Sequence, residues 1–260
     1  MGKTVVVWSC GHADPSINNS RFSYLGSMLY DLKPDYCIDL GDGADLRSLN
    51  SFDTRYPKAI VAESYEKDIE SYLDSQERLR HNFKKHKRKL PSWYGFAGNH
   101  EYRLDRAISL DPRLEGSKYG ISKKHLETNR FFNEYYDYKN SAPSIANYDG
   151  IDYAHFFNTG NSPNAASGIH HAYTLLQKRH VSSVCGHSHF RNLYFSDGMG
   201  QGKGIAGLVV GCMKGKEESW AGQGQLGWWK GAVILRNVEG GYFDPEFVSL
   251  DTMERLYKDE

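Results

Sequence analysis

The sequence predicts an α/β fold, because short apolar runs suited to buried strands alternate with longer segments that repeat at helical spacing. The clearest of these runs are residues 4–8, 36–40, 93–97 and 181–185. Each run is followed within a few residues by a glycine, which lets the backbone turn sharply, and by polar side chains. Ligands of open α/β sheets bind beyond the carboxyl ends of the strands, so these four positions predict one shared site.

The first predicted unit is a strand, a helix and a second strand. Between Phe22 and Leu32, apolar residues recur at helical spacing behind a capping stretch at residues 18–20, and Pro34 ends the pattern. Residues 63–87 again carry apolar side chains at helical spacing, so we expect a long helix in an insertion at about residues 48–90. This helix should pack against the sheet or cap the site.

The long helix has acidic residues at its start and a basic run, residues 78–89, at its end. This polarity matches the helix dipole, so a solvated helix end explains the basic run. A nucleic-acid-binding patch is the alternative interpretation of the same residues.

Helical spacing of apolar residues predicts a third helix at residues 165–176, leading into the run at 181–185. Strand-forming residues then predict a second sheet, whose last two strands are joined by a turn at residues 239–241. Its strands are expected at residues 193–195, 205–212, 231–238 and 242–250. A glycine-rich loop at residues 211–231 carries Trp220, Trp228 and Trp229, and we expect it at the surface, in contact with substrate.

Composition limits the protein class. The chain has 260 residues and no Pro/Ser-rich linker, so we expect a single domain spanning residues 1–260. Its 32 Lys and Arg residues balance 32 Asp and Glu residues, which leaves no net field to attract nucleic acid, acidic substrates or a membrane surface. No apolar run is long enough to span a membrane, and a strand begins at Val5, too early for a signal peptide.

The cysteine pattern adds to this expectation. The four cysteines (Cys10, Cys37, Cys185 and Cys212) have no CxxC spacing, which indicates reduced thiols in a cytosol. The expected protein is therefore soluble and cytoplasmic, with no membrane partner.

Four polar motifs follow the apolar runs, and their order is informative. They are Cys10-Gly11-His12, Gly41-Asp42-Gly43-Ala44-Asp45, Gly98-Asn99-His100-Glu101 and Gly186-His187-Ser188-His189. This order resembles the calcineurin-like metallophosphoesterase family, whose pattern is D-x-H, G-D-x-x-D, G-N-H-D/E, a lone His and G-H-x-H. The departure is Cys10, which stands where the family has Asp. The sequence of residues 9–15 is similar to that of phage-encoded members of the family, which would place the protein in the host cytoplasm.

The resemblance implies a four-layer sandwich of two mixed β-sheets flanked by helices. It also implies a metal-dependent phosphoric ester hydrolase with two divalent cations, with Mn²⁺ expected and Fe or Zn²⁺ compatible with the ligand types. Such a pair of cations clamps the phosphoryl group and acidifies a bridging water, which attacks as hydroxide.

The resemblance assigns metal ligands residue by residue. Asp42 would bridge both cations, and the lone histidine of the pattern would be His155, which follows the apolar run 151–154. His170 and His171 compete for that role, but they fall on the predicted third helix. The first cation would be held by His12, His189 and Asp42, and the second by Asn99, His155, His187 and Asp42.

Other residues are expected to support the reaction. His100 would donate a proton to the leaving group, and Glu101 would orient its ring and raise its pKa. Asp45 is expected to hold the turn after Asp42 without binding metal. Arg103 is a candidate substrate contact, as is Arg47.

Cys10 has two interpretations. As a thiolate it can replace the missing carboxylate as a metal ligand and shift the preference toward softer metals. Alternatively it is a small buried residue, and Asp14 or a water fills the vacant position.

The same motifs favour one function among several. Leu46-Arg47 follows Asp45, so the Arg-Gly pair typical of Ser/Thr protein phosphatases is absent. The Gly-His-Ser-His ending is more similar to phosphodiesterases and nucleases, so we expect a phosphodiesterase or nuclease acting on nucleic acid or nucleotides. The alternatives are a phosphomonoesterase or pyrophosphatase acting on a small metabolite, and a catalytically silent binding module.

Overall fold

The computed structural model describes residues 2–50, 64–116, 118–158, 164–197, 204–215 and 218–258. Its helices are α1 (Ser20–Leu32), α2 (Tyr65–Lys85), α3 (Tyr102–Leu110), α4 (Thr128–Phe131), α5 (His171–Arg179) and α6 (Leu250–Tyr257). Its strands are β1 (Lys3–Trp8), β2 (Tyr36–Asp39), β3 (Ser92–Phe96), β4 (Glu134–Tyr136), β5 (Ala146–Tyr148), β6 (Ile151–Tyr153), β7 (Ser183–Cys185), β8 (Arg191–Ser196), β9 (Ile205–Val210), β10 (Gly231–Glu239) and β11 (Tyr242–Ser249).

The strands form two mixed sheets. The first has the order β11-β10-β1-β2-β3-β4, with parallel pairing from β1 to β4 and antiparallel pairing from β1 to β11. The second has the order β5-β6-β7-β9-β8, and its inner strands β6, β7 and β9 are parallel. The predicted fold of two mixed sheets flanked by helices is confirmed.

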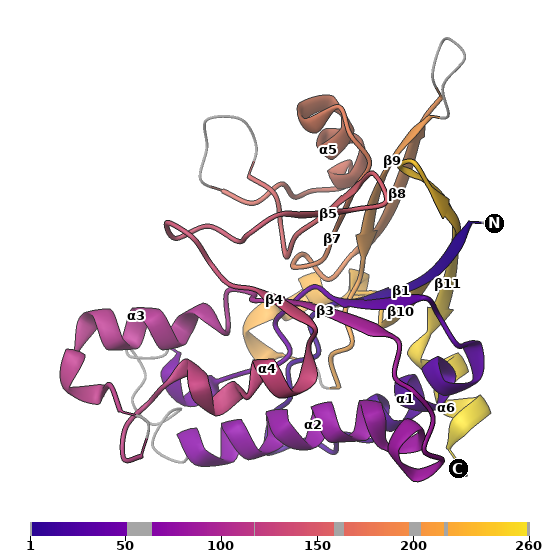
Figure 1. The fold of residues 1–260 in the computed structure, drawn as a ribbon. Helices are drawn as coiled ribbons and strands as arrows, with labels where there is room; N and C mark the ends of the chain where they lie inside the picture. Colours follow the sequence, from indigo (N-terminus) through magenta and orange to yellow (C-terminus); the bar gives the residue numbers. More distant parts are fainter. Residues whose placement is uncertain are drawn as a thin grey trace.

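Three apolar clusters separate four layers (Figure 1). The central cluster joins the sheets, since Val5, Val7 and Ile38 of the first pack with Val184 and Leu208 of the second. A second cluster lies between the first sheet and α1, α2 and α6. A third lies between the second sheet and α5. The two sheets are therefore fixed face to face, so loops at their edges have defined relative positions.

Two predicted features are wrong. Strands β10 and β11 do form a hairpin through Gly240 and Gly241, but they extend the first sheet, because β10 pairs with the free edge of β1. The helix that the sequence predicted at residues 165–176 is α5, and it begins at His171 rather than at residue 165. Gly168 has a φ of +90°, which no right-handed helix accepts, and Ile169 is 83% exposed.

The long helix α2 begins where Ser64 caps it by accepting a hydrogen bond from the Lys67 N–H. Within its basic run, Arg80 is buried, lies 4.0 Å from the centroid of the Trp93 ring and donates to the Phe131 carbonyl. Arg88 donates to the Tyr30 carbonyl at 2.7 Å. These contacts favour a structural role for the two arginines.

The packing of α5 on the second sheet depends on Gly207 in β9. A methyl group added there would lie 2.3 Å from the Ala172 carbonyl oxygen of α5. We expect Gly207→Ala to lower the free energy of unfolding by about 2 kcal/mol in urea denaturation, because the helix must move off the sheet. Gly224→Ala is the matched control, since nothing lies within 4 Å of the added group. Equal stability of the two variants would contradict this account of the layer.

Candidate metal centre

The polar motifs follow strands β1, β2, β3 and β7, and His155 follows β6. Strands β1, β2 and β3 are parallel to one another, as are β6 and β7, so their carboxyl ends lie along a common edge of each sheet. The facing sheets bring the two edges together, and side chains from five separate segments meet at one place.

The backbone is left-handed at five candidate ligands. The φ angles are 54° at Cys10, 44° at His12, 54° at Asp42, 65° at His187 and 62° at His189. Each such residue costs about 1–2 kcal/mol relative to a relaxed backbone, and strain of this kind concentrates at functional sites. At His187 and His189 the turn brings both imidazoles to the site, His187 beside His155 and His189 beside His12, although strand alternation alone would separate them.

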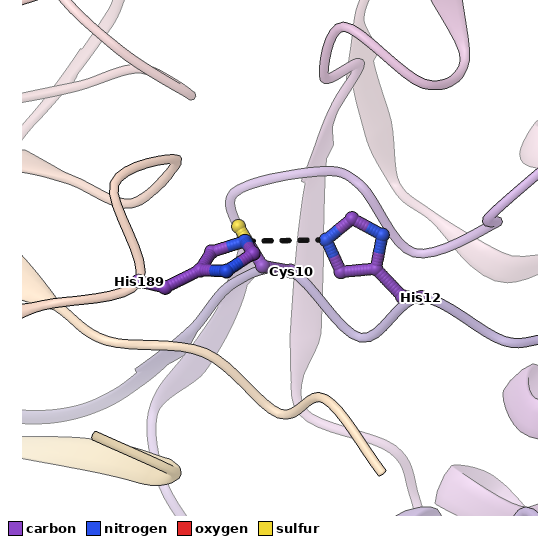
Figure 2. Close-up of side chains that lie close together, drawn as sticks. All are labelled: Cys10, His12 and His189. Atoms are coloured by element: carbon purple, nitrogen blue, oxygen red, sulfur yellow. Dashed lines mark hydrogen bonds between the residues drawn. The ribbon is translucent and has the colours of Figure 1, made fainter. Parts of the chain in front are cut away.

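One group of donors surrounds His12. Its Nε2 lies 3.3 Å from His189 Nε2 and 3.9 Å from Asp42 Oδ2. Cys10 completes this group, because one donor atom from each of Cys10, His12 and His189 lies within 4.8 Å of the others (Figure 2). All three side chains are buried.

A second group surrounds His155. Its Nε2 lies 3.2 Å from Asp42 Oδ2, 3.1 Å from Asn99 Oδ1 and 3.2 Å from His187 Nδ1. Asp42 Oδ2 thus faces both His12 and His155, while Asp42 Oδ1 accepts a hydrogen bond from the His100 N–H at 2.8 Å. The residues predicted for the two cations are brought together in two groups that adjoin at Asp42.

The hydrogen bond at Nδ1 of His155 directs its Nε2 toward the other candidate ligands. His155 Nδ1 lies 2.7 Å from the Leu40 carbonyl, which can only accept, so Nδ1 carries the hydrogen and Nε2 offers a lone pair. That lone pair faces the carboxylate of Asp42 and the amide oxygen of Asn99. In the neutral ring this lone pair would repel the facing oxygens, and either a proton on Nε2 or a bound cation would remove the repulsion.

The histidines are held in the form that binds metal. Burial lowers the pKa of His187 to about 4 and that of His189 to about 3, and it lowers the pKa of His12 well below its usual value. Burial also opposes the charged form of His155, but the nearby Asp42 carboxylate raises its pKa. Three of the four imidazoles are therefore neutral at neutral pH, as metal ligation requires.

Asp45, rather than Glu101, orients the ring of His100. His100 Nδ1 donates to the Asp45 carbonyl at 2.7 Å and lies 2.9 Å from Asp45 Oδ1, which accepts from His12 Nδ1 at 3.1 Å. Burial opposes ionisation of Asp45, but the hydrogen bonds from His100 and His12 hold its pKa well below the usual value. Asp45 therefore fixes a candidate ligand and the candidate proton donor together, a larger role than the expected turn support.

Glu101 instead holds two motif loops together. Its carboxylate accepts hydrogen bonds from the backbone N–H groups of Gly98, Asp42 and Ala44 at 2.7, 2.9 and 2.9 Å. Burial and the neighbouring Asp42 raise the pKa of Glu101, and the N–H donors counteract this. The expectation that Glu101 orients His100 is wrong, because its side chain turns inward beneath the loops.

The structure also places the remaining candidates. Arg103 Nη1 donates to the Asp45 carbonyl at 2.8 Å, and its Nη2 lies 3.2 Å from His100 Nε2. Asp14 Oδ1 accepts from the N–H and hydroxyl of Ser16, and among the described residues the donor groups that include Cys10 are completed by other side chains. His171 lies 3.2 Å from the Ser188 hydroxyl, and Arg47 begins a short 3-10 helix, Arg47–Leu49.

Sequence reasoning missed Lys214. Its Nζ lies 3.0 Å from Glu218 Oε1, and both side chains are buried. Its positive charge, together with burial, lowers the pKa values of His12 and His189. A signal was present, since Lys214 follows β9 and Gly211 just as the other motifs follow a strand and a glycine.

The tryptophan loop borders the same donor group. The Trp228 ring lies 4.5 Å from the His189 ring, and the Trp229 N–H donates to the His189 carbonyl at 3.0 Å. On the other group, the Phe156 ring lies 4.9 Å from the His187 ring. Each of the two donor groups therefore has an aromatic ring beside it. The side chain of Trp220 lies outside the described residues.

The role of Glu101 is testable. Glu101→Gln replaces one acceptor oxygen by an NH₂ group that faces backbone N–H donors. We expect a loss of about 2 kcal/mol of stability in urea denaturation and a 10- to 100-fold weaker metal affinity by calorimetry. Glu115→Gln, at an exposed position, is the control and should change neither quantity. Unchanged metal affinity in Glu101→Gln would show that the loops keep their geometry without this carboxylate.

Comparison with known proteins gives little further information. No family model matches the sequence, and no curated protein matches it. Among solved structures, one match is a conserved uncharacterized protein from Streptococcus pneumoniae TIGR4, described as a predicted phosphoesterase. It is 12% identical over 96% of this chain and 91% of that chain, with a TM-score of 0.37. A similarity this low carries no argument about activity. None of the helices in the described residues is long and apolar enough to cross a membrane.

Proposed function

We propose that this protein is a metal-dependent phosphoesterase whose single domain binds two divalent cations. The observation that carries the proposal is the position of Asp42 Oδ2, which lies 3.9 Å from His12 Nε2 and 3.2 Å from His155 Nε2. One carboxylate oxygen thus adjoins two groups of buried donors. A paired centre needs such a shared anionic ligand to hold two cations close together.

The ligand sets follow from the two groups. His12, His189 and Asp42 would hold one cation, and Asn99, His155, His187 and Asp42 would hold the other. Two cations in these positions would supply Lewis-acid polarisation of the phosphoryl group and a more acidic water. Imidazole, amide and carboxylate ligands of this kind suit Mn²⁺, Fe and Zn²⁺.

The surrounding residues would handle the proton and the substrate. Asp45 holds the ring of His100 at Nδ1, and Nε2 of the same ring lies 3.2 Å from Arg103 Nη2. From this place His100 can donate a proton to the leaving oxygen. Arg103 and Lys214 bring positive charge to the centre, where it would offset that of the phosphoryl oxygens.

The aromatic border favours a phosphodiester with flat groups, such as a nucleotide or a nucleic acid. Trp228 adjoins His189 and Phe156 adjoins His187, so each donor group has an aromatic ring beside it. Bases stack on such rings without regard to sequence, which contributes about 1–3 kcal/mol per base. The proposed activity is therefore that of a phosphodiesterase or nuclease.

Metal content and substrate choice test this function. The purified protein should contain two transition-metal ions per chain by elemental analysis. Bis-p-nitrophenyl phosphate and single-stranded DNA should be hydrolysed faster than p-nitrophenyl phosphate, and a chelator should abolish all hydrolysis, because the phosphoryl charge would be left unopposed. A preference for the monoester would favour the phosphomonoesterase alternative. Hydrolysis unaffected by chelator and by His100→Ala would contradict the proposal.

A histidine pair tests the ligand assignment. His155→Ala removes the donor closest to Asp42, so we expect more than about a 100-fold loss of activity and loss of bound metal, beyond what a supporting residue contributes. His170→Ala is the matched control, because His170 is exposed at the N-terminus of α5. Metal retained in His155→Ala, measured by elemental analysis, would remove His155 from the ligand set.

A further inference from the structure

Cys10 belongs to both groups of donors. Its sulfur lies within 4.8 Å of the donor atoms of His12 and His189, and within 4.8 Å of those of Asp42 and His155. A ligand that binds a single cation would need to lie near only one of these two pairs, such as His12 and His189. The position of Cys10 therefore resembles that of Asp42, which also adjoins both groups.

The backbone and the surrounding loops fix the sulfur in this place. The Cys10 N–H donates to the Gly41 carbonyl at 2.8 Å, and the Cys10 carbonyl accepts from the Met213 N–H at 3.1 Å. The sulfur lies 3.1 Å from the Ser9 hydroxyl, and a side chain added at Gly186 would begin 3.8 Å from it. Segments of both sheets thus hold the sulfur from different sides.

The charge balance of a two-cation centre favours a thiolate at Cys10. The proposed protein ligands of both cations are neutral imidazoles and an amide, apart from Asp42. Two dications carry four positive charges, and one carboxylate offsets only one of them. A thiolate at Cys10 would supply a second negative charge between the two donor groups.

We propose that the Cys10 thiolate bridges the two cations, alongside Asp42, and makes the centre selective for thiophilic ions such as Zn²⁺ and Fe²⁺. This proposal rests on the proposed two-metal function. Binding releases the thiol proton to solvent and involves no oxidation or reduction. Two metal–sulfur bonds of about 2.3 Å can span the roughly 3.5–4 Å between paired cations, so one sulfur suffices.

X-ray absorption of the zinc-loaded wild-type protein tests the bridge directly. A bridging sulfur gives one zinc–sulfur contact for every zinc ion, at about 2.3 Å. A terminal sulfur gives one contact for every two zinc ions, and an uninvolved cysteine gives none; either result would overturn the proposal. Cys212→Ala is the control, because Cys212 is also buried but outside the donor groups of Cys10, and it should keep the sulfur contact.

Two variants test the selectivity. In Cys10→Ser the sulfur contact should vanish and the affinity for zinc should fall by at least about 10-fold at both sites. In Cys10→Asp two metals should still bind, but the ratio of Mn²⁺ to Zn²⁺ affinity should rise by at least about 10-fold, because a hard oxygen replaces sulfur. An unchanged ratio would overturn the selectivity.

The proposal and the proposed function fail in different ways. A wild-type protein that binds two zinc ions and hydrolyses diesters without a sulfur contact would refute the bridge and leave the function intact. A wild-type protein that binds no metal would refute the function as well. Circular dichroism and thermal unfolding of each Cys10 variant show whether a loss of zinc reflects lost ligation or lost folding.

Discussion

The whole site depends on one electrostatic constraint, which is that imidazole nitrogens, a carboxylate and an amide oxygen from both sheets are held within about hydrogen-bonding distance of one another. His155 Nε2 faces the oxygens of Asp42 and Asn99, and His12 Nε2 faces His189. His155, Asp42 and His12 are buried, so the interactions between their polar atoms are weakly screened, and a shared proton or a bound cation stabilises the arrangement. A protein that places such groups together needs a rigid scaffold around them.

Hydrogen bonds from buried charged side chains connect the motif loops to one another, in addition to their connection to the sheets. Glu101 binds N–H groups of the second and third motifs, and Asp45 links His12 to His100. Arg21 adds a further link, because its guanidinium donates to the carbonyls of Gly11 and Met213. These buried charged groups act on backbone positions, so each one sets the direction of a neighbouring donor.

Parts of the fold were predictable because local rules govern them. The buried strands before each motif and the hairpin at Gly240 follow from residue patterns over short stretches. The start of α5 was missed because helical spacing continued through Gly168, whose backbone is left-handed. The sequence analysis also placed β10 in the wrong sheet, because β10 pairs with β1, and pairing between segments so far apart in sequence does not follow from local residue patterns.

By itself, the sequence determined where strands end and which donor residues follow them, since chain order carries both. Only the tertiary structure decided how those donors meet: that Asp45 orients His100, that Glu101 holds loops, that the charge of Lys214 acts on His12, and that Cys10 rather than Asp14 adjoins both groups. The physical reason is that side-chain partnership depends on loop direction, and loop direction is set by contacts between the two stacked sheets.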